Sequence, residues 1–291
     1  NDEVANIKVG DFEAHTTWGK DDYGVSLLQV NEGGTINFDA DTAVFDGSTN
    51  AAGGVFGSGG WGTLNVTANE KLTIDGNICG TYGKMTGGNH ANTKFILKVT
   101  AKDLDMTGDI NAGNMGTGYS NHDRKTEVTV KATESGKLVG NINAYKQGTI
   151  AVDLGQGSLD GNVTADAGTI GLGGTITFDS SKTSFTTATN GIINLTGGIM
   201  DGSLNIADGS NVNLTGATFK AADLATALTG AGTLTLKGNG ILETVAGQVF
   251  TIGDTKATEL TGNAVTDNAK AKVDFESGTL KLTDAEYTLE Y

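Results

Sequence analysis

Proline is absent from the 291 residues, and cysteine occurs only once, at Cys79. The absence of proline and of a three-residue glycine period excludes collagen, although the chain contains 45 glycines, roughly twice the average usage. A single cysteine cannot form an internal disulfide, and no apolar run approaches the roughly 20 residues that cross a bilayer as a helix. The chain therefore lacks the signatures of fibrous, disulfide-stapled and helical membrane proteins.

Basic residues are scarce as well. The chain has 19 lysines and arginines against 34 aspartates and glutamates, for a formal net charge of −15. Such a surface repels phosphate, so nucleic acid and anionic lipid are poor partners and no nucleic-acid binding is expected, whereas metal cations or a protein with a basic face suit it better. Solubility alone is the simpler interpretation of this charge. The first residue is Asn1 rather than methionine, which favours an exported protein whose signal peptide has been removed, although an expression product would look the same.

A five-residue phrase recurs along the chain: an apolar residue, a spacer, glycine, a small polar residue and another apolar residue. Its copies are Ile74–Ile78, Met106–Ile110, Leu138–Ile142, Leu159–Val163 and, more loosely, Met200–Leu204. The glycines are 32, 32, 21 and 41 residues apart. A unit of about 21 residues, sometimes lengthened by about eleven and once doubled, accounts for these gaps.

Each of the first four copies follows a segment in which apolar and polar residues alternate, as in Leu64–Thr67 and Ile150–Leu154. A strand, a tight turn of a few polar residues and a second strand bent at glycine form one coil of a solenoid. We therefore expect an all-β fold, a parallel β-helix (β-solenoid) with an irregular N-terminal cap. One short helix is expected near residues 219–229, where an alanine-rich segment is followed by Gly230.

Three regions are expected along the chain: residues 1–32, an N-terminal cap or assembly segment; residues 33–218, the solenoid; and residues 219–291, a less regular C-terminal β region. The strand predicted at Val4–Val9 either caps the solenoid or adds to a neighbouring molecule. The final strand, Tyr287–Tyr291, indicates a fragment of a longer protein or pairs with a partner. The candidate assembly residues are Val4, Ile7, Val9, Tyr287, Leu289 and Tyr291.

Two insertions lengthen the repeat, at residues 80–90 and 114–122, and both contain Gly, Met, Tyr, Asn and His in a similar order. Insertions in repeat proteins collect on one face, often the binding face, so both should project from the same edge. The candidate binding residues are Tyr82, Met85, His90, Met115, Tyr119 and His122. His90 and His122 could stack and bind a metal with Asp123, but surface histidines explain them more simply.

No cofactor is predicted, although bound Ca²⁺ stays a possibility and the metal content is unknown. Residues 39–47 begin like an EF-hand loop but lack the acidic third ligand and the glycine at the required position. Polysaccharide hydrolysis is the enzyme class that best suits a solenoid, and Asp103 with Asp105, or Asp75 with Asp109, could supply paired carboxylates. Asp and Asn are also common at turns, so we expect no enzymatic activity.

Segments such as Gly62–Val66, Leu72–Ile78 and Gly232–Leu236 resemble the β-helical passenger regions of bacterial autotransporter adhesins and related surface and S-layer proteins. The likeness covers roughly residues 33–215 and 230–252. It implies an extracellular protein of the bacterial cell surface that self-associates as a coat or filament, or adheres to a host cell, a neighbouring cell or a glycan. The long catalytic insertion of protease passengers is missing, which argues against an enzyme. A polysaccharide-binding or polysaccharide-degrading β-helix protein is the alternative.

Overall fold

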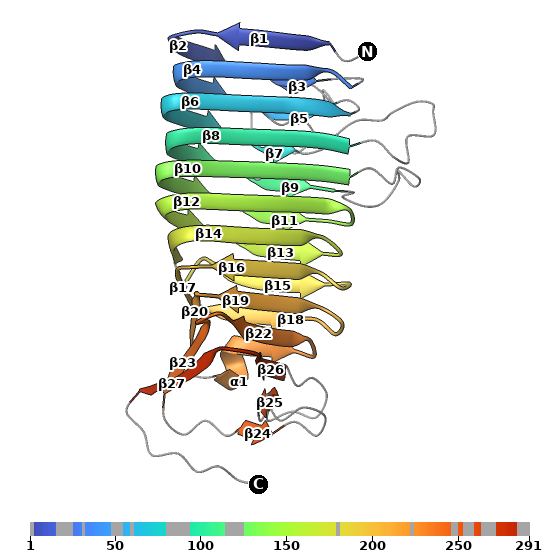
Figure 1. Cartoon of the computed structure of the whole chain (residues 1–291), viewed down its shortest axis with the longest axis vertical. Coiled ribbons are helices and arrows are strands. Elements are labelled where there is room, and N and C mark those ends of the chain that lie inside the picture. Colours follow the sequence, from blue (N-terminus) through green and yellow to red (C-terminus); the bar gives the residue numbers. More distant parts are fainter. Residues whose placement is uncertain are drawn as a thin grey trace.

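A computed structural model describes residues 3–15, 26–30, 33–47, 55–58, 61–79, 94–113, 125–178, 181–221, 224–245, 250–252, 259–262 and 272–283. About three quarters of these residues lie in β-strands, which stack one above another into an elongated body (Figure 1). The expected all-β class and its parallel strands are confirmed, because every strand pair but two is parallel. The two antiparallel pairs both involve β25 (Glu259–Gly262).

The described strands form two sheets. Sheet A contains 18 strands: β1 (Val4–Lys8), β2 (Asp11–His15), β4 (Thr35–Asp46), β6 (Gly62–Asp75), β8 (Lys94–Thr107), β10 (Lys125–Val139), β12 (Gly148–Asp160), β14 (Thr169–Phe178), β16 (Ile192–Thr196), β17 (Ile199–Asp201), β19 (Asn211–Thr215), β20 (Thr218–Ala221), β22 (Thr233–Lys237), β23 (Ile241–Val245), β24 (Phe250–Ile252), β25, β26 (Lys272–Phe275) and β27 (Thr279–Thr283). Sheet B contains nine: β3 (Leu28–Val30), β5 (Phe56–Ser58), β7 (Ile78–Cys79), β9 (Ile110–Ala112), β11 (Ile142–Ala144), β13 (Val163–Asp166), β15 (Ser184–Ala188), β18 (Ser203–Ile206) and β21 (Leu228–Gly230). Inward side chains of both sheets belong to one hydrophobic core.

One column of paired residues runs through sheet A from end to end. Its members are Ala5, Ile36, Leu64, Leu97, Val128, Ile150, Ile170, Ile193, Val212, Leu234 and Val273. From Leu64 onward every member is buried. Ten steps at the interstrand spacing of about 4.8 Å make the column about 50 Å long.

The alternation seen in the sequence separates the two faces of sheet A. In β6, Leu64 and Val66 are buried, whereas Thr63 and Asn65 face outward. The sequence predicts a tight turn in the polar segment after Val66, but the strand does not end there. β6 continues to Asp75 through a register shift between Ala68 and Lys71, so this corner is a β-bulge in a bent strand rather than a separate turn.

The recurring glycine phrase forms the corner between the two sheets. Its glycine has a positive φ in all five copies, for example 136° at Gly108 and 152° at Gly140. A Cβ built on Gly140 would lie 2.1 Å from the carbonyl oxygen of Gly108, in the repeat next to it. Only glycine allows the backbones to stack this closely with this φ.

The polar residue after the glycine links neighbouring repeats in the first four copies. The backbone N–H of Asp109 donates to Asn77 Oδ1 (2.8 Å), and that of Asn141 donates to Asp109 Oδ1 (2.7 Å). The N–H of Asn162 continues the ladder by donating to Asn141 Oδ1 (2.9 Å). The final apolar residue of the phrase then enters sheet B, where Ile78, Ile110 and Ile142 pair in one column.

The two ends of the stack differ. At the N-terminal end, β1 and β2 both pair with β4. At the C-terminal end, β26 pairs with β22 on one side and with the antiparallel β25 on the other. The short helix expected within residues 219–229 is present as α1 (Leu224–Ala227). The division into three regions stays a prediction.

Replacing Gly140 with alanine tests the corner. We expect the free energy of unfolding to fall by about 2 kcal/mol or more, because the new Cβ meets the Gly108 carbonyl and alanine resists a φ of 152°. Gly171→Ala is the matched control: its Cβ would find its nearest atom 3.9 Å away, so stability should hold or rise slightly. Urea unfolding followed by circular dichroism measures both. Equal stability of the two variants would contradict the proposed role of the corner.

Candidate functional site

Most of the site residues expected from sequence lie outside the described residues. This holds for the six insertion residues and for the C-terminal assembly residues: Tyr82, Met85, His90, Met115, Tyr119, His122, Tyr287, Leu289 and Tyr291. Their roles stay predictions. The strands on either side of the two insertions do stack, β7 on β9 and β8 on β10.

The remaining assembly residues, Val4, Ile7 and Val9, lie at the N-terminal end of sheet A. Val4 is 58% exposed and Ile7 is 37% exposed, whereas Val9 is partly buried against the core. All five residues of β1 are exposed. Among the described residues β1 pairs with β4 alone, so in this part of the chain it is an edge strand with exposed apolar side chains.

Aromatic packing holds this end of the stack in place. The ring of Phe12 in β2 lies 4.8 Å from that of Phe38 and 5.3 Å from that of Phe45. Phe45 in turn contacts Phe56 of sheet B, with the ring centroids 4.8 Å apart. The edge strands therefore rest on a firm aromatic cluster.

An asparagine ladder crosses the outer face of the same strands. Asn65 Nδ2 donates to Asn37 Oδ1 (2.8 Å), and Asn37 Nδ2 donates to Asn6 Oδ1 (2.9 Å). The ladder ends at Asn6 on the edge strand, and the side-chain amide of Asn6 carries donors for a further partner.

His15 on β2 lies between two carboxylates, those of Glu13 and Asp46. Its Nδ1 lies 3.1 Å from Asp46 Oδ2, and its Nε2 lies 3.6 Å from Glu13 Oε2. The hydrogen bond to Asp46 raises the pKa of His15 above 6.5, and Glu13 adds to this effect while desolvation opposes it. His15 therefore holds its proton more firmly than a free histidine.

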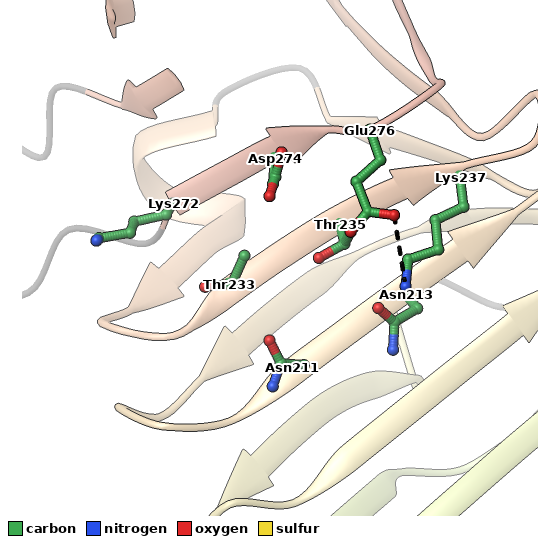
Figure 2. A pocket seen from close by; sticks show the side chains of 8 residues that line it. All are labelled: Asn211, Asn213, Thr233, Thr235, Lys237, Lys272, Asp274 and Glu276. Carbon is green, nitrogen blue, oxygen red and sulfur yellow. Dashed lines mark ion pairs between the residues drawn. The ribbon is translucent and has the colours of Figure 1, made fainter. Parts of the chain in front are cut away.

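A polar groove lies on the outer face of sheet A near the C-terminal end (Figure 2). Its volume is about 420 Å³, and outward side chains of β19, β22 and β26, with Glu276 just beyond β26, line it. The lining residues are Asn211, Asn213, Thr233, Thr235, Lys237, Lys272, Asp274 and Glu276.

Strand register brings these side chains together. Asn213, Thr235 and Asp274 form one outward column across the three strands. Thr235 and Asp274 are only 5% and 6% exposed, so they form the floor of the groove. Lys237 Nζ lies 3.7 Å from Glu276 Oε2 at the end of the groove. The positive charges of the two lysine ammonium groups balance the negative charges of the two carboxylates. The amides and hydroxyls supply both hydrogen-bond donors and acceptors.

Sequence reasoning missed this groove. The alternation of Asn211 with Asn213 and of Thr233 with Thr235 was visible, and it places these residues on one face. Lys272, however, pairs with Thr233 across 39 residues of sequence, almost twice the basic repeat. The repeat length alone therefore could not predict that β26 aligns with β22.

The described residues contain no group of three or more His, Cys, Asp or Glu side chains arranged to hold a metal ion, so they do not support a site for calcium or another metal. Within the same part of the chain, no helix has the length and apolar character needed to cross a membrane.

The pKa of His15 gives a pH prediction. We expect an NMR titration of the His15 ring to give a pKa above 6.5, and Asp46→Asn to bring it back toward 6.5. Because the folded-state pKa is raised, the stabilisation from this pair is fully present below about pH 6.5 and is lost as the pH rises through the folded-state pKa. Glu13→Gln is the milder control. A ring that titrates identically with and without Asp46 would contradict this contact.

No family model matches this chain, and no curated protein or solved structure matches it. The likeness to autotransporter passengers therefore rests on the sequence pattern.

Proposed function

We propose that this chain is a non-catalytic structural protein of the bacterial cell surface, folded as a parallel β-helix, that self-associates. The observation that carries this proposal is the unbroken column of paired residues from Ala5 to Val273, with an exposed strand edge at its N-terminal end. A stack with a continuous core has a fixed length and direction, which suits a spacer or building block.

The β-helix assignment is supported by how the chain returns to each sheet. Every glycine corner carries the chain from sheet A to sheet B, and the next repeat re-enters sheet A one strand further along. Corresponding residues therefore stack at the same depth, as in Ile78 on Ile110 and Leu64 on Leu97. This stacking supports a coil that winds around a shared interior.

A structural role is also supported by what the candidate catalytic carboxylates do. Asp109 Oδ1 accepts hydrogen bonds from both the backbone N–H and the side-chain amide of Asn141. Asp103 Oδ1 accepts from the hydroxyl of Ser135 in the neighbouring strand. These side chains join neighbouring repeats, which accounts for their presence without invoking turnover.

The acidic surface and the sequence pattern support the proposed location. A net charge of −15 keeps such rods soluble outside the cell and limits indiscriminate contact between copies. Association then requires a defined surface, and the exposed edge strand supplies one.

Electron microscopy and sedimentation of the purified chain test this function together. We expect elongated particles whose mean mass rises with protein concentration, because the open edge pairs in trans. Ribonuclease A, a compact soluble protein, serves as the non-associating reference. Compact particles, or a mass that stays monomeric up to the solubility limit, would contradict the proposal.

Carbohydrate binding is a second candidate function, and the polar groove favours it. A neutral, polyhydroxylated ligand matches a lining in which charges balance and hydroxyl, amide and carboxylate groups converge. The volume of about 420 Å³ falls within the usual range for small-ligand sites.

Calorimetric titration with neutral oligosaccharides tests the groove. Asp274→Asn should weaken binding about tenfold, because a carboxylate on the floor of the groove accepts stronger hydrogen bonds from sugar hydroxyls than an amide does. Asp75→Asn, an exposed change outside the groove, should leave the affinity unchanged. Absence of binding by the wild-type chain, or equal loss in both variants, would exclude this candidate.

A further inference from the structure

The direction of each backbone group in β1 can be worked out from its pairing with β4. Thr35 N donates to the carbonyl of Glu3 (2.8 Å), and Val9 N donates to the carbonyl of Asp39 (3.0 Å). In a parallel ladder alternate residues point their N–H and C=O groups to the same side. The backbone N–H and C=O groups of residues 3, 5, 7 and 9 therefore point toward β4. Those of Val4, Asn6 and Lys8 point to the opposite side of β1.

The three alternate residues Val4, Asn6 and Lys8 carry all the outward backbone groups of β1, and they are placed symmetrically about Asn6. If β1 pairs with a second β1 related by a two-fold axis through Asn6, Asn6 faces Asn6 and Val4 faces Lys8. All three pairs are then hydrogen-bonded pairs of an antiparallel ladder, so each outward N–H and C=O finds a partner. The inward and outward faces of sheet A continue unchanged into the second copy.

The side chains suit this register. Ala5 and Ile7, which lie over Ile36 and Phe38, meet across the axis on the inner face. On the outer face the two Asn6 amides meet at the end of the asparagine ladder, and each can donate to the other while still accepting from Asn37. Lys8 lies opposite Val4 rather than opposite another lysine, so no like charges oppose each other.

The opposite end of the stack is a poorer partner for β1. A head-to-tail arrangement would place β1 on the free side of β26, but β25 already pairs there. A second copy of β1 offers an edge that no other described strand pairs with, and this edge has the same length and the same alternation of outward backbone groups. The occupant favoured by the described residues is therefore the same strand of another molecule.

We propose that two copies of this chain associate head to head through an antiparallel β1–β1 pair centred on Asn6. This inference rests on the proposed self-association and names the surface that carries it. The pair joins two sheets A into one longer sheet and buries the exposed apolar side chains of β1.

Proline at position 6 tests the pairing, because it removes an outward N–H and leaves the bonds to β4 in place. We expect Asn6→Pro to raise the dissociation constant measured by sedimentation about tenfold or more, with a circular dichroism spectrum and melting temperature that match those of Asn6→Ala, since both variants lose the hydrogen bond from Asn37. Asn6→Ala is the matched control: it keeps the backbone N–H, so its dimers should be weakened less than those of Asn6→Pro.

A cysteine at the same position tests the symmetry independently of stability. In a Cys79→Ser background, Asn6→Cys should form a disulfide-linked dimer on mild oxidation, because facing residues of a hydrogen-bonded antiparallel pair lie about 5.5 Å apart at Cα. Lys137→Cys, an outward position in the middle of the stack, should stay monomeric. Association that is undiminished by Asn6→Pro, or the absence of the Asn6→Cys dimer, contradicts this pairing and leaves self-association standing. A wild-type chain that stays monomeric contradicts both.

Discussion

Close stacking of backbone at the glycine corners sets the geometry of the whole molecule. A Cβ on Gly161 would lie 2.0 Å from the carbonyl oxygen of Gly140, so any side chain there would force neighbouring repeats apart. With glycine in place the chain turns sharply from one sheet into the other. The next residue then reaches the repeat beside it with a hydrogen bond, and the one after it enters the core. A single five-residue phrase thus provides the turn, the link between repeats and a core side chain.

Stability in such a stack is distributed over neighbouring repeats rather than held at one centre. Each inward residue contacts its equivalents in the adjacent repeats, and the outward asparagine and aspartate ladders tie the same neighbours together. The ends are the exceptions, because a terminal repeat has a neighbour on one side only. Antiparallel β25 covers β26 at one end, whereas at the other end no described strand pairs with the outer side of β1. The proposed association at this edge would use the same backbone hydrogen bonding that builds the interior.

Much of the fold could be predicted because the repeat places chemically similar residues at equivalent positions. The glycine phrase, the alternating strands and the short helix followed from steric and periodic constraints that act locally. The bend in the strands of sheet A did not: Ala68, Asn69 and Glu70 break the alternation and look like a turn, yet pairing resumes beyond them through a bulge. Whether backbone pairing survives such an interruption depends on the neighbouring strand, which a single sequence does not show.

The candidate sites were less predictable for a related reason. Val4 and Ile7 could be singled out as apolar residues of a terminal strand, and the structure places them at an exposed edge. The polar groove depends on β26 aligning with β22 across an irregular spacing, so Asp274 had no visible partner in the sequence. A groove formed by three strands requires the register of all three.

Distances along one outward column test the central claim, the in-register stacking of successive repeats, most directly. Asn65, Asn194 and Asn213 lie in the same column, with five steps from Asn65 to Asn194 and one more to Asn213. Spin labels on Asn65 and Asn194, and on Asn65 and Asn213, should give pulsed electron paramagnetic resonance distances of about 24 and 29 Å, which differ by one interstrand spacing. Distances that fail to grow by about 5 Å per step would contradict the stacking on which the fold and both candidate sites depend.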